Sequence, residues 1–242
     1  MSHHTYLYKG INRSVGKALH QYQMISDGDR IAVGLSGGKD SLALMWILNE
    51  RKSRAPVNYQ IFGIYIDPGF EDSYAEKLLQ FCHAQGFYLK VEHSNFGILA
   101  HSSKNRENPC FLCSRLRRKR LFEIASELGC SKIALGHHMD DIIETLFLNI
   151  CYAGEISTMV PFQPLFNGNL TLIRPLAFTE ENTIKRFAME KAFPIFRNPC
   201  PTEKTSKRKF IKEMLQPLYK SNKKIKGNIF RALNNVKTEY LL

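Results

Sequence analysis

Short runs of apolar and β-branched residues alternate along this chain with longer segments of helical periodicity, and no other feature limits the fold as much. The runs are too short for amphipathic helices and indicate buried strands. Strands joined by helices are parallel, because a parallel pair needs a long crossover connection. The sequence therefore predicts an α/β fold with a doubly wound, mostly parallel, Rossmann-like sheet. The expected strands are residues 30–35, 59–66, 87–91, 132–135 and 170–175, and the expected helices are residues 11–25, 41–52, 74–85, 116–128, 141–151 and 179–191, the last capped by Thr179.

The length of 242 residues fits one large domain, or one domain with an appendage. We expect an N-terminal helix over residues 1–28, a nucleotide-binding domain over 29–178 and a basic C-terminal extension over 179–242. The chain has no run of 18 apolar residues and does not begin like a signal peptide. We therefore expect a cytoplasmic protein without a membrane segment.

Positive charge is concentrated in two regions. The chain has 34 Lys and Arg residues against 22 Asp and Glu residues, a net charge of +12. Residues 115–120 contain five cations, and residues 204–237 contain eleven cations with Glu213 as the only acid. Such regions occur on solvated surfaces, but clusters of this density more often meet a polyanion. Nucleic acid is the expected partner.

Ligands on doubly wound sheets bind beyond the carboxyl ends of the strands, which here means the loops after Leu35, Ile66 and Leu135. The first loop contains two glycines that let backbone N–H groups approach an anion. The helix that follows directs its positive end at the same place. The loop therefore predicts a phosphate site. Its expected binding residues are Leu35, Ser36, Gly37, Gly38, Lys39, Asp40 and Ser41.

This loop differs from the common P-loop, Gly-x-x-x-x-Gly-Lys-Ser/Thr. Val33 stands at the position of the first glycine, and Asp40 replaces the Ser or Thr that follows the lysine. A carboxylate beside phosphates is repulsive unless a cation lies between them, so Asp40 indicates bound Mg²⁺. The pattern Ser-Gly-Gly-x-Asp-Ser resembles the PP-loop of the ATP pyrophosphatases, which split ATP into AMP and pyrophosphate. A glycine-rich turn without a ligand is the alternative.

Two further loops supply candidate nucleoside contacts. Ile66 and Asp67 end the second strand, where members of the pyrophosphatase superfamily commonly hold adenine through backbone groups. Gly136 follows the fourth strand and lets the backbone come close to a nucleoside. His137 is the other expected contact there, and it and His138 are equally compatible with a ligand and with a local hydrogen bond.

Two adjacent carboxylates, Asp140 and Asp141, stand at the start of the next expected helix. A helix N-cap needs one carboxylate, so the pair indicates a metal or catalytic role for at least one of them. Together with Asp40 they are the expected catalytic residues.

The six cysteines fall into two groups. In a chain without an export signal, thiols, metal sites or redox chemistry are more expected than disulfides. A Cys-x-x-Cys pair and one further cysteine lie beside prolines in loop-like sequence, where an iron–sulfur cluster, a zinc site and a redox pair are all open. Residue types alone favour the cluster modestly, because no fourth zinc ligand is evident. The expected core cysteines are Cys82, Cys130 and Cys151, and the expected ligands are Cys110, Cys113 and Cys200.

Four segments in order resemble the tRNA 2-thiocytidine biosynthesis proteins (TtcA type) of the PP-loop ATP pyrophosphatase superfamily. They are residues 110–118, 132–141, 146–149 and 173–177, within a similarity that runs from about residue 22 to 215. The resemblance implies a homodimer, ATP with Mg²⁺, and a [4Fe–4S] cluster on Cys110, Cys113 and Cys200. Well-known members carry a second Cys-x-x-Cys at the third ligand, whereas here Pro201, Thr202 and Glu203 follow Cys200.

The function implied is ATP-dependent, iron–sulfur-dependent thiolation of a cytidine in the tRNA anticodon loop. The partners would be tRNA and a sulfur donor, either a cysteine desulfurase or sulfide. One alternative is an adenylating tRNA-modifying enzyme without a cluster, similar to a lysidine synthetase. The other is a non-catalytic iron–sulfur RNA-binding module.

Overall fold

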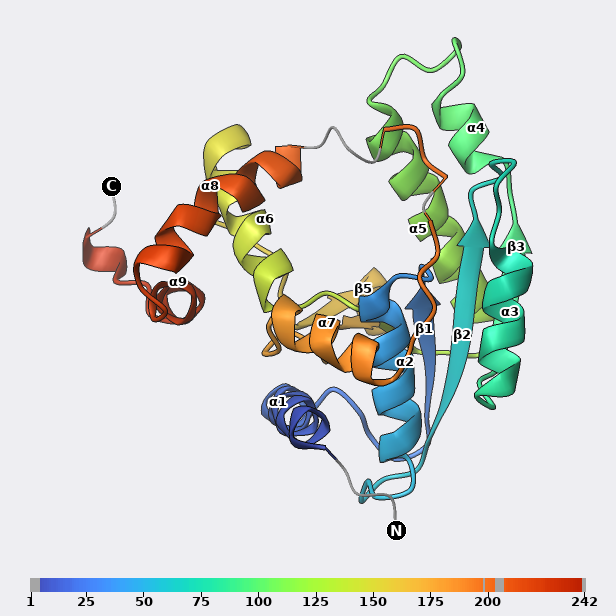
Figure 1. The fold of residues 1–242 in the computed structure, drawn as a ribbon, viewed down its shortest axis with the longest axis horizontal. Helices are drawn as coiled ribbons and strands as arrows, with labels where there is room; N and C mark the ends of the chain where they lie inside the picture. The colour runs from blue at the N-terminus through green and yellow to red at the C-terminus, as the bar shows by residue number, and fades with distance from the viewer. Residues whose placement is uncertain (1–4, 198, 203–206, 241–242) are drawn as a thin grey trace. The chain divides into compact units, whose positions relative to one another are not determined.

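The computed structural model describes residues 5–197, 199–202 and 207–240. The chain forms two compact units (Figure 1). The first contains Met1–His138 and Pro161–Pro201, and the second contains Met139–Val160 and Thr202–Leu242. The domain limits at residues 28 and 178 stay a prediction, because packing alone does not show which parts fold independently.

The first unit is built on a six-stranded sheet with the order β3-β2-β1-β4-β6-β5. All neighbouring strands are parallel except β5 and β6, which are antiparallel. The predicted α/β, doubly wound and mostly parallel sheet is confirmed, and the antiparallel edge strand β5 was not expected. The strands are β1 (Asp29–Leu35), β2 (Tyr59–Asp67), β3 (Leu89–His93), β4 (Lys132–Ala134), β5 (Phe162–Leu165) and β6 (Leu170–Ile173).

Helices cover both faces of this sheet. Successive side chains of β1 face opposite sides: Ile31 and Val33 join one core layer and Ala32 joins the other. Helices α1, α2, α3 and α7 pack on the first face, and α4 and α5 on the second. The helices of this unit are α1 (Tyr6–Gln21), α2 (Lys39–Arg51), α3 (Ala75–Ala84), α4 (Phe96–Ala100), α5 (Pro109–Glu127) and α7 (Glu181–Glu190).

Several helix starts differ from the sequence prediction: α1 begins at Tyr6, five residues before the expected start. Helix α5 begins at Pro109, seven residues before the expected start, because the Asn108 side chain accepts hydrogen bonds from the first turn and proline suits the first helical position. Cys110 and Cys113 therefore lie in a helix and not in a loop. The expected cap Thr179 is also wrong: Glu180 is the N-cap of α7, without a side-chain capping bond.

The second unit consists of α6 (Met139–Tyr152), α8 (Lys207–Ser221) and α9 (Ile225–Ala232). Ile143 of α6 packs against Ile211 and Leu215 of α8 in a small core of its own. None of the helices in the described ranges is both long and apolar enough to cross a membrane.

Two of the three expected core cysteines are confirmed. Cys82 and Cys130 are buried, and burial raises the pKa of the Cys82 thiol to about 11. Cys151 is exposed near the end of α6, so its assignment to the core was wrong.

Phe187 should be the main anchor of α7 on the sheet. It is fully buried and meets the Trp46 ring edge-to-face at 5.4 Å. We expect Phe187→Ala to lower the free energy of unfolding by about 3–5 kcal/mol, measured by urea unfolding followed by circular dichroism. Met189→Ala on the same helix is the control: Met189 is 66% exposed, and its change should stay within about 0.5 kcal/mol. Equal losses would contradict this packing.

Candidate active site

The loop between β1 and α2 is closed by its own hydrogen bonds. The Ser41 hydroxyl donates to the Gly38 carbonyl (2.9 Å) and accepts from the Ser36 N–H (3.1 Å). Gly38 is the N-cap of α2 and has no side chain to satisfy the first N–H groups of the helix. These donors and the positive end of the helix are therefore available to an anion.

The backbone conformation and the surroundings of Gly37 both disfavour a residue with a side chain at this position. Its φ of +74° lies in the left-handed region. A Cβ here would also lie 2.7 Å from the Tyr74 ring and 3.1 Å from the Phe196 ring. The loop thus runs directly beneath two aromatic side chains that the sequence pattern did not single out.

Lys39 and Asp40 are held by charged groups of the same unit. The Lys39 amino group lies 3.0 Å from an Asp40 carboxylate oxygen and 3.1 Å from Glu181 of α7. Burial lowers the pKa of Lys39, but Asp40 and Glu181 outweigh it and the net shift is upward. The other Asp40 oxygen lies 3.7 Å from the ring of the buried His138. Glu181 was missed because nothing in its local sequence links it to the loop.

The loop after β4 meets the start of α2, because β4 pairs with β1 at the point where the strand order reverses. A Cβ on Gly136 would lie 3.0 Å from backbone atoms of both Asp40 and Ser41. Any side chain would therefore push the two loops apart. The structure brings together the expected residues of the first and fourth strands at one edge of the sheet, where such folds bind nucleotides.

The Asp67 side chain forms hydrogen bonds within the loop that follows β2. Its buried carboxylate accepts hydrogen bonds from the Gly69 N–H (2.9 Å) and the Ser73 hydroxyl, and it lies 3.4 Å from His93. These bonds shape the turn after β2. Ile66, the other expected residue here, is buried at the end of the strand.

Arg174 places a buried positive charge beside His137. Its Nε donates to His137 Nδ1 at 3.2 Å, and its side chain lies 3.4 Å from Gln163. Burial, with a smaller contribution from Arg118, lowers the pKa of Arg174 to about 10. Arg174 follows β6 at the same sheet edge as the phosphate loop. The sequence pointed to it only as part of a family motif.

The structure brings the three expected ligand cysteines close to one another. Cys110 and Cys113 lie in the first turns of α5, and Cys200 lies in the segment after α7. Burial raises the pKa of Cys113, the charge of Arg117 opposes the rise, and Cys200 and Cys110 add to it. All six cysteines are described, and each is a thiol outside any disulfide. Asn198, two residues before Cys200, lies outside the described residues.

Within the described ranges, no three His, Cys, Asp or Glu side chains converge closely enough to hold a single metal ion. A zinc site needs its thiolates about 2.3 Å from one point. An iron–sulfur cluster binds each thiolate at a different iron and so accepts more widely spaced sulfurs. Three neighbouring thiols, two of them at a helix N-terminus that stabilises thiolates, therefore fit a cluster better than zinc.

Asp140 and Asp141 belong to the second unit, in the first turn of α6. Lys226 of α9 lies 2.7 Å from Asp140, and Arg208 of α8 lies 3.0 Å from Asp141 and 3.5 Å from Glu144. These ion pairs join the three helices of that unit. The catalytic role expected for the two aspartates stays a prediction.

The cationic segment 115–120 is partly neutralised within the fold. Arg120 pairs with Glu92 (2.7 Å), Glu127 (2.8 Å) and Glu123 (3.2 Å), and Arg115 pairs with Glu107 (3.1 Å). The segment thus offers less open positive charge to a polyanion than its composition suggests. Its exposed cations are Arg115, Arg118 and Lys119, and Lys119 also lies 3.9 Å from Glu123.

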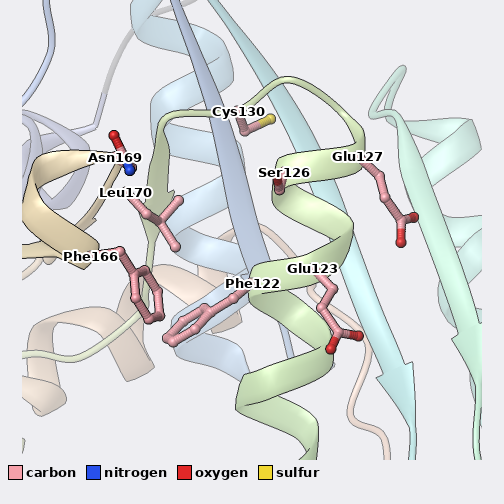
Figure 2. A pocket seen from close by; sticks show the side chains of 8 residues that line it. All are labelled: Phe122, Glu123, Ser126, Glu127, Cys130, Phe166, Asn169 and Leu170. Carbon is pink, nitrogen blue, oxygen red and sulfur yellow. The ribbon is translucent and has the colours of Figure 1, made fainter.

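A cavity of about 520 Å³ lies between α5 and the start of β6 (Figure 2). The Phe122 and Phe166 rings meet edge-to-face on its wall at 5.9 Å, and Cys130 also lines it. Cys130 precedes β4, so the cavity lies at the amino ends of the strands. This is the opposite edge from the phosphate loop and not where such sheets bind substrates.

Sheet order, phosphate loop and switch-point glycine together define a nucleotide-binding protein of the PP-loop class. Residues 7–219 match the model of the PP-loop domain family ATP_bind_3. Two relatives, from Geobacter sulfurreducens and Photorhabdus laumondii, are each named tRNA-cytidine(32) 2-sulfurtransferase. They are 40% and 41% identical over 97% of this chain, and the match covers 93% and 78% of their lengths. The chain therefore belongs to the PP-loop domain family and, within it, to the family of the tRNA-cytidine(32) 2-sulfurtransferases.

Solved structures agree with this placement. The U34-tRNA thiolase NcsA from Methanococcus maripaludis, solved with its [4Fe-4S] cluster, matches 98% of this chain and 80% of its own. The TM-score is 0.79 and the identity 25%. An NH3-dependent NAD synthetase from Campylobacter jejuni matches with a TM-score of 0.53 at 16% identity, over 98% of this chain and 95% of its own, which shows a shared fold alone.

Gly136→Ala tests the contact between the two loops. The new methyl group has only backbone to press against, so we expect ATP affinity to fall about ten- to hundredfold, as overpacking costs about 1–3 kcal/mol. Titration calorimetry with Mg²⁺ and ATP would measure it. The matched control is Gly10→Ala in α1, where no atom lies within 4 Å of the added carbon. Equal affinities in the two variants would refute the contact.

Proposed function

We propose that this chain is an ATP-dependent tRNA sulfurtransferase that replaces the 2-oxygen of an anticodon-loop cytidine, position 32, by sulfur. The observation that carries the proposal is the presence in one compact unit of a PP-loop and three neighbouring thiols. An adenylating enzyme without a cluster would leave that group of thiols without a purpose. A binding module would have no need of the PP-loop.

The first half-reaction forms a good leaving group on the base. The carbonyl oxygen at C2 attacks the α-phosphorus of ATP, and pyrophosphate departs. The backbone N–H groups of Gly37 and Gly38 and the start of α2 would bind the phosphates, and Lys39 would exchange its carboxylate partners for phosphate oxygens. Gly136 lets the loop after β4 close over the nucleotide.

Asp40 is the residue that would hold Mg²⁺. Its carboxylate lies in the first turn of α2 beside the phosphate loop, 3.0 Å from Lys39 and 3.7 Å from the His138 ring, where a bound cation would also meet the nucleotide phosphates. When bound, Mg²⁺ would neutralise phosphate charge during the displacement. A contribution from Asp140 or Asp141 remains part of the proposal.

The second half-reaction exchanges oxygen for sulfur. A sulfide equivalent attacks C2, AMP carries away the former carbonyl oxygen, and one proton is released, so no external oxidant or reductant is required. When bound to Cys110, Cys113 and Cys200, a [4Fe–4S] cluster would supply an iron without a protein ligand as the place for that sulfur.

The remaining expectations are part of the same proposal. A tRNA substrate supports a cytoplasmic location, and a cysteine desulfurase or free sulfide would provide sulfur. The homodimer rests on the resemblance to the family. Exposed cations such as Arg118 and Lys119 would contact tRNA phosphates.

The activity is tested by adding the protein, ATP, Mg²⁺ and sulfide to unmodified tRNA without oxygen. We expect 2-thiocytidine in the nucleoside digest, read by mass spectrometry, with AMP and pyrophosphate as the other products. Asp40→Asn should reduce product formation at least about a hundredfold, because Mg²⁺ loses a ligand. Products of ADP and orthophosphate, or tRNA without sulfur, would refute the proposal.

The cluster has a test that is independent of activity. Protein purified without oxygen should be brown and contain about four irons per chain. Changing Cys110, Cys113 or Cys200 to Ala should remove the iron. Cys151→Ala is the matched control, since Cys151 is an exposed thiol in the other unit, and its iron content should equal that of the wild type. Stoichiometric zinc without iron would contradict the assignment.

A further inference from the structure

The segment after α7 connects the core to the third cysteine. Ala192 adopts a left-handed conformation (φ +48°) and turns the chain out of the helix. Phe193 then anchors the segment by edge-to-face contacts with Phe81 (6.1 Å) and Phe187 (5.9 Å). Figure 1 shows the segment rising from the end of α7 past β1 toward the start of α5. Residues 193–197 belong to no helix or strand, and Phe193 holds their first end.

Its second anchor is the phosphate loop itself. The Phe196 ring stacks on Tyr74 with centroids 5.0 Å apart and planes 16° from parallel. The Tyr74 hydroxyl donates to the Ser36 carbonyl at 2.7 Å, and both rings lie against Gly37. Beneath Tyr74 is the ring of Tyr65, 5.4 Å away and almost wholly buried. The backbone that would bind phosphate is therefore in direct contact with the residue four positions before Cys200.

We propose that Tyr74 and Phe196 are positioning residues which make the placement of Cys200 depend on the nucleotide in the phosphate loop. Phosphate bound at Gly37 and Gly38 fixes the loop, and the Ser36–Tyr74 hydrogen bond fixes the stack. The stacked Phe196 then holds the end of the segment beside Cys110 and Cys113. In this proposal the segment that carries Cys200 has an ordered and a disordered arrangement. Bound nucleotide shifts the equilibrium between them by its difference in affinity for the two.

This coupling rests on the proposed function and adds an order of events to it. Nucleotide in the phosphate loop would favour the arrangement in which Cys200 lies beside Cys110 and Cys113. Binding of ATP, which activates the base, would thereby be coupled to the site that supplies sulfur.

The test measures how fast each thiol reacts in the full-length, cluster-free protein with all cysteines reduced. Iodoacetamide labelling is followed by peptide mass spectrometry, with and without a non-hydrolysable ATP analogue and Mg²⁺. In the wild type we expect the nucleotide to slow labelling of Cys200 about two- to tenfold, the range that corresponds to one aromatic pair. Labelling of the exposed Cys151 should not change.

Phe196→Ala should abolish the nucleotide effect on Cys200 while the analogue still binds in calorimetry. Phe196→Tyr keeps the ring, and Ile195→Ala removes a neighbouring side chain that is 97% exposed, so both should keep the effect. If nucleotide slowed Cys200 labelling equally in Phe196→Ala, it would shield the thiol directly and the proposal would fail. If the nucleotide did not change the labelling rate of Cys200 in the wild-type protein, the proposal would also fail.

Tyr74→Phe provides a second variant that preserves both rings and the fold. It removes the hydrogen bond to Ser36, together with the interaction of the same hydroxyl with Tyr65. The nucleotide effect should therefore decrease, and an undiminished effect would contradict the coupling. The tRNA assay separates this result from the activity. Formation of 2-thiocytidine with no change in labelling would leave the function standing and refute only the coupling.

Discussion

The close approach of Gly136 to the backbone of Asp40 and Ser41 is the contact on which the rest of the site depends. It exists because β4 returns beside β1, which reverses the strand order at that point. Two loops that are almost a hundred residues apart in sequence thereby share one sheet edge. The phosphate loop can keep a helix N-terminus open to an anion, because Ser41 closes the loop from within.

The proximity of the three cysteines follows from a different constraint. Asn108 and Pro109 start α5 early, which places Cys110 and Cys113 one turn apart at the positive end of a helix. Cys200 follows a segment that Phe193 and Phe196 hold by ring contacts with Phe81 and Tyr74. At Cys113 the charge of Arg117 favours the thiolate, whereas burial opposes it and the net shift of the pKa is upward.

The positively charged side chains have two roles, which the composition alone does not distinguish. The net charge of +12 suggests a polyanionic partner. Yet Arg120 is bound by three carboxylates, and Arg208 and Lys226 hold the acidic first turn of α6 in the second unit. Part of the positive charge therefore stabilises the fold, and the cations that remain exposed are the ones suited to tRNA.

The sequence by itself determined the alternation of strands and helices, the phosphate loop and the family, because these follow from local periodicity and contiguous motifs. It missed β5, whose pairing with β6 is decided by tertiary contacts, and it placed the pair of cysteines in a loop because the capping effect of Asn108 went unrecognised. Only the tertiary structure brought Glu181 to Lys39, Arg174 to His137 and Phe196 to Tyr74. Each of these contacts joins two segments that are far apart in the sequence and meet only in the folded protein. A local sequence pattern carries no information about the distance between such residues.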